Sequence, residues 1–341
     1  MESMASQTEQ TMDSPKGFLA NLLGSEGRAW RIMRESGILG ALIILIVVGA
    51  IISPHFLKTF NLINVIRQIA IAGIIGVGMT FVILTAGIDL SVGSIVGFVA
   101  VISASMLRAG VPWFVVIPLG LIAGGFVGSL NGFGVTKGKL QPFIMTLGML
   151  VIARGVTMTY SQGQPISIGD AAESFSWLGA GSWLGIPVPV WFLILVAILS
   201  GLTLTYTPFG RHVYAVGDNA EAARLSGINV DLVTFGVYVI AGVLSALSAL
   251  ILVSRLTTGE PLQGTGFELD AIAIVVIGGT SLFGGEGGIR GTLIGAAIVA
   301  VLANLLNLTG VSPFSQQIVK GLIIIGAVLL ERRKASLMER G

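Results

Sequence analysis

The chain has 341 residues, of which 11% are charged and 54% hydrophobic, and its mean hydropathy is +0.93. Soluble domains carry about 25% charged residues, so too few charges are present to cover a water-soluble core. The formal net charge of +2 and the lack of a basic face argue against a nucleic-acid partner. The chain has no cysteine, and its two histidines, His55 and His212, lie far apart. We therefore expect an all-α integral membrane protein without disulfides or a metal site.

The apolar residues fall into segments long enough to cross a bilayer, which takes about 20 mostly apolar residues. Several segments are rich in glycine, which allows membrane helices to pack closely. We predict ten transmembrane helices, at residues 37–53, 66–88, 91–109, 112–135, 142–160, 188–206, 232–254, 269–283, 290–309 and 314–330.

The two ends of the chain are polar. Residues 1–36 carry mixed charge and lack the apolar stretch of a signal peptide, so we expect a cytoplasmic tail there. Residues 37–330 then form the transmembrane domain, and residues 331–341 form a basic tail. Lys and Arg accumulate on the cytoplasmic side of membranes, and an inner N-terminus places most of these residues there. Because ten is an even number, both termini are predicted to be cytoplasmic.

A faint internal repeat is visible in the sequence. NGFGVTKGKLQPF (131–143) resembles NLLNLTGVSPF (304–314), and in both an Asn-bearing helix end precedes a Pro-Phe helix start. Five predicted spans separate the equivalent helices. Such a repeat is inverted in the membrane, as in many transporters, so we expect a possible inverted five-helix repeat.

Motifs for catalysis are missing from the sequence. Gly138-Lys139 is followed by Leu140, and Phe133 stands where a phosphate-binding loop needs its first glycine. The run GGTSLFGGEGGIRG (278–291) follows an apolar helix rather than a strand, so we expect a tight cytoplasmic turn there. Two distant histidines provide no catalytic triad. The chain is predicted to have no catalytic residue and to bind no nucleotide or other cofactor.

The longest internal loop, TPFGRHVYAVGDNAEAARLSGINVD (207–231), is predicted to contain a short helix. Asp218 or Asn219 suits its N-cap, Glu221 its first turn, Arg224 its last turn and Gly227 a left-handed stop. A helix of roughly eight residues needs a packing partner to be stable. That partner is either the lipid headgroups or a groove on a cytoplasmic protein.

Four stretches of this sequence resemble one known family. GRHVYAVGDNAEAARLSGINV (210–230) closely resembles the coupling-helix loop of sugar permease subunits of ATP-binding-cassette importers. Similar to signatures of the same family, in the same order, are TFVILTAGIDLSVGS (80–94), PFIMTLGMLVIARGVTM (142–158) and TGFELDAIAIVVIGGTSLFGGEGGIRGTLIGA (265–296). The resemblance covers residues from about 37 to 330. It implies a permease subunit in the bacterial inner membrane.

The resemblance also implies partners. These are a second copy of the chain, a cytoplasmic ATPase that binds ATP and Mg, and a periplasmic sugar-binding protein, with lipid around them. RLTTGEPLQGTGFELDAIA (255–273) and LNLTGVSPFSQQIVKG (306–321) are most similar to ribose-type members, although relatives for xylose, galactose, inositol or autoinducer-2 share these motifs. The implied ATPase contact comprises Gly210, Arg211, Asn219, Ala220, Glu221, Ala223, Arg224 and Gly227.

Polar groups inside the predicted spans are costly in lipid and face a cavity or a partner. Arg154 and Lys320 map to the outer half of the membrane, and an ion pair of either residue with Asp270 is the favoured interpretation over sugar contact. Asp89 is either a pathway residue or a helix cap near Ser91. The remaining candidates carry donors and acceptors that suit a sugar or glue helices together: Asn131, Thr146, Asn304, Gln316 and Gln317.

Two other classes of function stay open at this point. A secondary transporter driven by an ion gradient needs a carboxylate near the midplane, whereas Asp89, Glu268 and Asp270 map to span ends. A membrane-embedded enzyme needs a nucleophile with a base or a set of metal ligands, and the sequence offers neither. The importer subunit is therefore the leading hypothesis.

Overall fold

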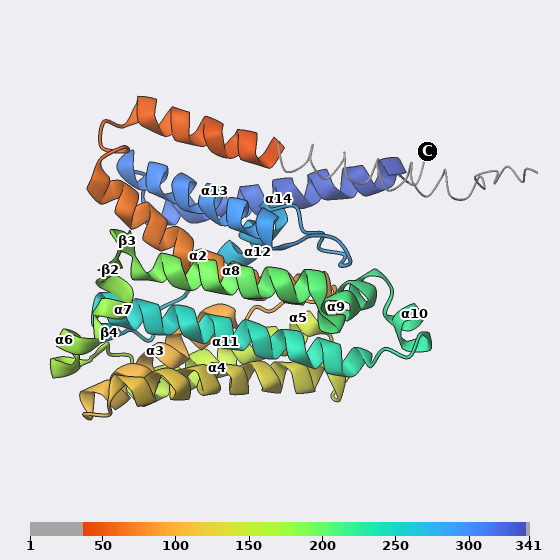
Figure 1. Cartoon of the computed structure of the whole chain (residues 1–341), viewed down its shortest axis with the longest axis horizontal. Helices are drawn as coiled ribbons and strands as arrows, with labels where there is room; N and C mark the ends of the chain where they lie inside the picture. Colours follow the sequence, from red (N-terminus) through yellow and green to blue (C-terminus); the bar gives the residue numbers. More distant parts are fainter. Residues whose placement is uncertain (1–36, 339–341) are drawn as a thin grey trace, which may run out of the picture.

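The computed structural model describes residues 37–338, so the predicted tail 1–36 and the last three residues lie outside the described part. Long helices dominate this part, and most lie roughly side by side in a bundle (Figure 1). The helices of the bundle are Gly37–Ile52, α2 (Thr59–Leu84), α3 (Val92–Arg108), α4 (Trp113–Thr136), α5 (Pro142–Ser161), α8 (Val188–Tyr206), α11 (Val230–Leu256), the short α12 (Phe267–Ile277), α13 (Ile289–Leu308) and α14 (Pro313–Met338).

Short elements gather at the two ends of the bundle. Figure 1 places α6, α7, β2, β3 and β4 at one end and α9 and α10 at the opposite end. Strand β1 pairs with β4, and β2 pairs with β3, both antiparallel. The short elements are β1 (Ile166–Ser167), η1 (Gly169–Ala171), α6 (Ala172–Phe175), α7 (Trp177–Ala180), β2 (Ser182–Trp183), β3 (Ile186–Pro187), α9 (Pro208–Asp218), α10 (Ala220–Leu225) and β4 (Thr258–Gly259).

The described helices confirm the prediction of an all-α membrane protein. Six of them, α2, α4, α5, α8, α11 and α13, are long and apolar enough to cross a membrane, and Gly37–Ile52 and α3 are shorter apolar helices. On α4 the exposed side chains are apolar: Ile122, Phe126 and Phe133 are more than 60% exposed. Their spacing of four and seven residues places them on one helix face, which suits contact with lipid.

Three predicted spans need correction. The last, predicted at 314–330, continues as α14 to Met338, so most of the predicted tail 331–341 is helical. The predicted helix 269–283 is only 11 residues long as α12, about 17 Å, whereas the hydrocarbon core is about 30 Å thick. It ends at Ile277 because Gly278 and Gly279 follow, and Gly279 adopts a positive φ of 83° that ends a right-handed helix. The predicted helix 66–88 is α2, which begins at Thr59 and ends at Leu84.

Helices α2 and α11 form the centre of the bundle. Their most apolar windows are 72% and 67% buried, against 22% for α5. Helix α11 lies against α4 with glycine on both sides, since a Cβ on Gly124 would lie 2.5 Å from the carbonyl oxygen of Gly242. Small residues let helix backbones touch in this way, and the contact holds α4 on the core without large side chains.

Candidate functional site

The loop 207–231 folds into two helices, of which α9 was not predicted from the sequence. The Asn219 side chain caps α10: its Oδ1 accepts hydrogen bonds from the backbone nitrogens of Glu221 (3.0 Å) and Ala222 (2.9 Å). Of the two capping residues that the sequence left open, the structure selects Asn219. Arg224 pairs with Glu221 at 2.8 Å, and Gly227 ends the helix with a φ of 85°. The loop is therefore locally well determined by caps.

The exposed face of α10 differs from the predicted one. Ala223 is only 4% exposed and packs with Val216 and Val233 in a buried apolar cluster. Ala223 therefore holds α10 on the bundle instead of lying on its free surface, which corrects the expected contact face. On the opposite side Leu225 is 82% exposed. The exposed residues of α10 are Ala220, Glu221, Ala222, Arg224 and Leu225.

The end of α9, in the loop 207–231, packs against backbone atoms of α2 and of the turn before α13. The Gly285 nitrogen donates a hydrogen bond to the Leu84 carbonyl oxygen (3.1 Å), where α2 ends. Gly217, the next-to-last residue of α9, lies against the Gly285 nitrogen and the Leu84 oxygen. A Cβ on Gly217 would overlap the Leu84 oxygen. A Cβ on Gly284 would lie 2.8 Å from the Gly217 oxygen. We call Leu84, Gly217, Gly284 and Gly285 the glycine junction, which connects α9, α2 and the turn before α13.

The turn that supplies Gly284 and Gly285 is the glycine-rich run 278–291. Gly284, Gly285 and Gly287 all adopt positive φ, which confirms the predicted tight turn. The Tyr214 hydroxyl donates a hydrogen bond to the Gly287 oxygen (3.0 Å), so α9 contacts this turn a second time.

Asp89, Asn131 and Thr146 hold the short non-helical segment between α2 and α3. The Ser91 nitrogen and hydroxyl donate to Asp89 Oδ1 at 2.8 and 2.6 Å, and Asn131 Nδ2 donates to Ser91 Oγ at 2.8 Å. The Thr146 hydroxyl donates to the Ile88 oxygen at 3.1 Å. Asp89, Ser91, Asn131 and Thr146 have no exposed surface. Asp89 holds Ser91, the residue before α3, but it does not cap the helix, because no side chain accepts from the first-turn amides of α3.

Arg154 has a comparable task on the segment between α11 and α12. Its guanidinium donates to the backbone oxygens of Pro261 and Gln263 and to the Gly93 oxygen on α3. It is Lys320 that pairs with Asp270, with its Nζ 2.8 Å from Oδ1. Arg154 therefore braces irregular backbone, which membrane proteins tolerate only where protein satisfies its polar groups.

The last predicted residues lie near the end of α13 and the start of α14. Asn304 and Asn61 exchange two amide hydrogen bonds, of 2.7 and 3.0 Å, that join α13 to α2. Gln316 Nε2 donates to Asn307 Oδ1 at 2.7 Å. Gln317 is exposed. These positions do not converge on one site, and their hydrogen bonds connect helices.

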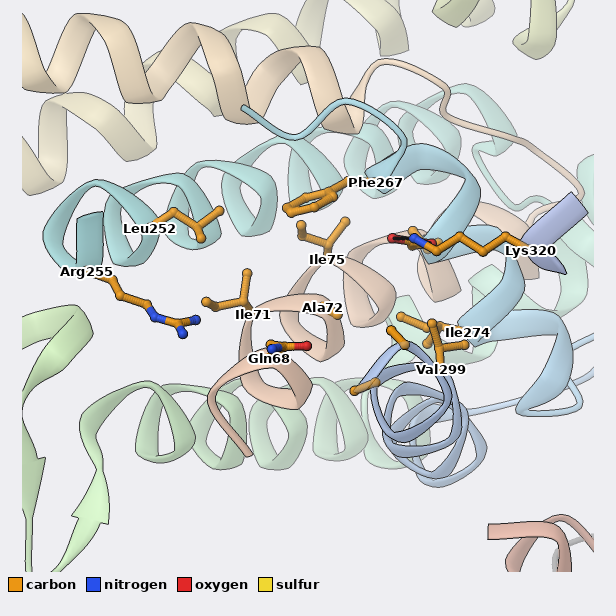
Figure 2. Close-up of a pocket in the computed structure, with 14 residues that line it drawn as sticks. Gln68, Ile71, Ala72, Ile75, Leu252, Arg255, Phe267, Ile274, Val299 and Lys320 are labelled. Atoms are coloured by element: carbon orange, nitrogen blue, oxygen red, sulfur yellow. Dashed lines mark hydrogen bonds and ion pairs between the residues drawn. The ribbon is translucent and has the colours of Figure 1, made fainter. Parts of the chain in front are cut away.

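A cavity of about 200 Å³ lies between α2, α11, α12, α13 and α14 (Figure 2). Of the residues predicted from the sequence, only Asp270 and Lys320 line it. The polar residues Gln68 and Arg255 and the aromatic Phe267 also line the cavity and were not predicted. A usable signal was present for Gln68, because it is a strongly polar residue within the apolar run that forms α2.

A bundle of apolar helices with broken helix segments, an internal cavity and a capped loop at one end defines a polytopic membrane permease. Residues 61–328 match the family described as branched-chain amino acid transport system / permease component, and the chain belongs to this family. It is a multi-pass permease subunit and not itself an enzyme.

Several curated proteins are similar to the chain over most of its length. The ribose import permease protein RbsC of Haemophilus influenzae is 48% identical over 85% of this chain and 91% of its own. The protein of the same name from Escherichia coli K12 is 45% identical over 90% of this chain and 96% of its own. The L-arabinose transport system permease protein AraH of E. coli K12 is 36% identical over 91% and 93%, respectively. No solved structure matches the chain.

Proposed function

We propose that the chain is the transmembrane subunit of an ATP-driven importer that carries ribose across the bacterial inner membrane. The observation that carries this proposal is the 45–48% identity to ribose import permeases over 85–90% of the chain. The L-arabinose and D-allose permeases are less similar, at 36% and 40% identity. The alternative is an importer of the same family that carries xylose, galactose, inositol or autoinducer-2.

The energy source in this proposal is a separate cytoplasmic ATPase, which binds ATP and Mg. Its docking point is the exposed face of α10, where Leu225 is 82% exposed and the helix is fixed by the Asn219 cap. The contact includes the exposed loop residues Arg211, Ala220, Glu221, Arg224 and Gly227. Gly210, which the sequence also placed in the contact, is buried against α8 and is excluded from it. The glycine junction then connects the docking point to α2.

The proposed topology has ten membrane helices with both termini in the cytoplasm. In this arrangement α9 and α10 lie inside, and β1 to β4 with α6 and α7 lie outside, where a periplasmic sugar-binding protein delivers its cargo. Tryptophan supports this orientation, because it favours membrane interfaces: Trp113, Trp177, Trp183 and Trp191 all fall in or beside the outer segments.

An inverted repeat of two five-helix halves underlies this topology. Helices α2, α3, α4 and α5 then correspond to α11, α12, α13 and α14. Two features support the repeat: Gly-Ile-Asp-Leu-Ser (87–91) before α3 matches Gly-Phe-Glu-Leu-Asp (266–270) at the start of α12, and α5 and α14 both begin with Pro-Phe. Each half thus has a short helix that follows a non-helical segment, a device that transporters use near their binding sites.

Two copies of the chain form one pathway in the proposed assembly. The experiment reconstitutes the chain with its ATPase and its binding protein in sealed vesicles and measures uptake of labelled ribose. We expect uptake that requires ATP and all three components. Uptake that follows an imposed proton or sodium gradient without the ATPase would overturn the proposal in favour of a secondary transporter.

A further inference from the structure

We propose that the cavity between α2, α11, α12, α13 and α14 is a monosaccharide-binding site inside each permease subunit. This inference rests on the proposed function and adds the place where the sugar stops within the protein. The cavity volume of about 200 Å³ is smaller than the roughly 300–1,000 Å³ of pockets for drug-sized ligands. Its size suits a single sugar ring and excludes a disaccharide.

The cavity is lined by polar side chains from four helices, α2, α11, α12 and α14. Figure 2 shows Gln68 of α2 between Arg255 of α11 and Lys320 of α14. Lys320 Nζ lies 2.8 Å from Asp270 Oδ1 and 2.9 Å from Oδ2, so both oxygens face one ammonium group. Carboxylate, amide and guanidinium groups together supply acceptors and donors, which is the combination that sugar hydroxyls need.

Two of these side chains have hydrogen-bonding capacity to spare. Within residues 37–338, no hydrogen bond is made by the Gln68 amide, and the Arg255 guanidinium makes one, from Nη2 to Asn64 Oδ1 at 3.3 Å. Both side chains are only partly buried, so their unused donors and acceptors can reach a ligand in the cavity. A polar ligand in the cavity would satisfy both side chains.

The rest of the wall is apolar and includes an aromatic ring. Phe267, the first residue of α12, points into the cavity on the side opposite Gln68 in Figure 2, and Ile71 and Ile75 lie beside it. A sugar ring carries C–H groups on one face and hydroxyls on its edge. An aromatic and aliphatic wall facing a row of polar groups matches this amphipathic shape.

The position of the cavity in the fold also supports a substrate site. Phe267 and Asp270 lie in the first turn of the short helix α12, directly after the non-helical segment that Arg154 braces. Short or interrupted helices mark the substrate sites of transporters built from inverted repeats. A lipid acyl chain is the other candidate occupant, but hydrocarbon would offer no partner to the Gln68 amide and none to the donors of Arg255 beyond the bond to Asn64.

The test uses the absence of cysteine from the natural chain. Ala72→Cys places a thiol on α2, one turn from Gln68, in the cavity wall. Ala109→Cys, in the exposed turn between α3 and α4, is the control. Each variant is assembled with its ATPase in membranes, and modification by a small water-soluble methanethiosulfonate is timed with and without D-ribose. Sucrose serves as the control for a sugar too large to enter.

We expect ribose to protect Ala72→Cys and to leave Ala109→Cys unaffected. At ten times the dissociation constant about nine-tenths of the sites are filled, so modification should slow about tenfold. Adding Gln68→Leu or Phe267→Leu should weaken protection by about five- to tenfold, since each removes one contact to the sugar. Leu269→Ala, on the exposed side of α12, should leave protection intact.

Two outcomes would overturn the inference. One is an Ala72→Cys assembly that imports ribose with ATP and yet shows no protection at any ribose concentration. The other is a thiol that reacts only with membrane-soluble reagents, which would identify lipid as the occupant. Failure of the proposed function is distinguished by the natural chain, because that failure shows as the absence of ATP-dependent ribose uptake before any cysteine is introduced.

Discussion

Asn61 and Asn304 show how a single pair of side chains can join two membrane helices. Each amide donates to the oxygen of the other, and Asn304 is only 6% exposed. Because the exchange is reciprocal, removal of either side chain breaks both hydrogen bonds. The pair is therefore more sensitive to a single substitution than to the loss of both residues.

We predict that Asn304→Leu lowers the stability of the detergent-solubilised protein by about 1–3 kcal/mol, because Asn61 Oδ1 loses its donor and Asn61 Nδ2 keeps only its bond to the Phe56 oxygen. Asn61→Leu together with Asn304→Leu should cost less than the sum of the two single changes. Thermal unfolding of the four proteins forms a double-mutant cycle that measures this coupling. Additive losses would show that the amide pair contributes no coupling energy.

Leu225 is the residue on which the docking proposal depends most. A large apolar side chain that is 82% exposed on the proposed cytoplasmic side is a natural anchor for a partner. We predict that Leu225→Ser abolishes co-purification of the ATPase from membranes while the permease level is maintained. Leu140→Ser, an exposed leucine in the turn between α4 and α5, is the matched control. ATPase binding that survives Leu225→Ser would place the contact elsewhere.

Ala223, on the buried side of α10, is expected to affect ATPase binding in a different way from Leu225. Because Ala223 is buried against Val216 and Val233, Ala223→Trp would displace α10 from the bundle. A loss of ATPase binding in that variant would report a misplaced helix and not a blocked surface.

At the scale of elements, the glycine junction joins α9 to α2 and to the turn before α13. Backbone contacts of this kind have little room for adjustment, since neither partner has a side chain that can rotate away. A movement of α9 must therefore move the end of α2 or break the junction.

We predict that Gly217→Ala uncouples ATP hydrolysis from transport. Its new Cβ would overlap the Leu84 oxygen, and overpacking of about 1–3 kcal/mol corresponds to a fall in uptake of roughly tenfold. The ATPase should still bind, because α10 keeps its own cap. Uptake and ATP hydrolysis are measured on the same vesicles. Gly201→Ala, at an open position on α8, is the control.

A milder change guards against a folding defect in that experiment. Tyr214→Phe removes the hydroxyl that donates to the Gly287 oxygen without adding volume. We expect Tyr214→Phe to lower the amount of sugar transported per ATP hydrolysed, but by less than Gly217→Ala does. Full coupling in both variants would rule out the junction as the transmitting contact.

Six helices of the described part could be predicted from the sequence because each is long and apolar enough to cross the membrane. Helix α8 begins and ends at the predicted residues, 188 and 206, since prolines mark its start and Thr207 precedes another proline. Helix α12 was predicted to start two residues late and to end six residues late, because its apolar sequence continues into glycines that turn the chain. Local composition does not reveal where such a helix stops.

The cavity was beyond sequence-based prediction for a different reason. Gln68, Arg255 and Phe267 come from three helices far apart in the chain, and only packing brings them together. Asp270 and Lys320 were recognised because charges in a membrane need partners, and the Lys320–Asp270 pair is the one that forms.

At the scale of the whole molecule, topology and assembly remain predictions. We predict that the protein purifies as a homodimer in mild detergent and in nanodiscs without its partners, because helix α5 is only 22% buried in its most apolar window and has a face free for a second copy. The molecular mass of the purified particle shows whether the protein is a dimer. A monodisperse monomer in both detergent and nanodiscs would contradict the prediction.

Thiol labelling of intact cells tests the orientation. Single cysteines at Ala5 and Met338 should stay unlabelled by an impermeant reagent, whereas Ala109→Cys should react. The reverse pattern would invert the topology and place α10 on the wrong side for an ATPase.

Helix α2 runs without proline or interruption from Gln68 in the cavity to Leu84 in the glycine junction. These residues are 16 positions apart, which is about 24 Å along the helix axis. Gly73, Gly76 and Gly78 press α2 tightly against α8, α12 and α11 along this length. A continuous helix so held behaves as a stiff lever whose length is fixed. If ATP hydrolysis moves the Leu84 end of α2, the Gln68 end must move by the same amount. One cycle of hydrolysis would then open the sugar site by one fixed displacement rather than by a graded one.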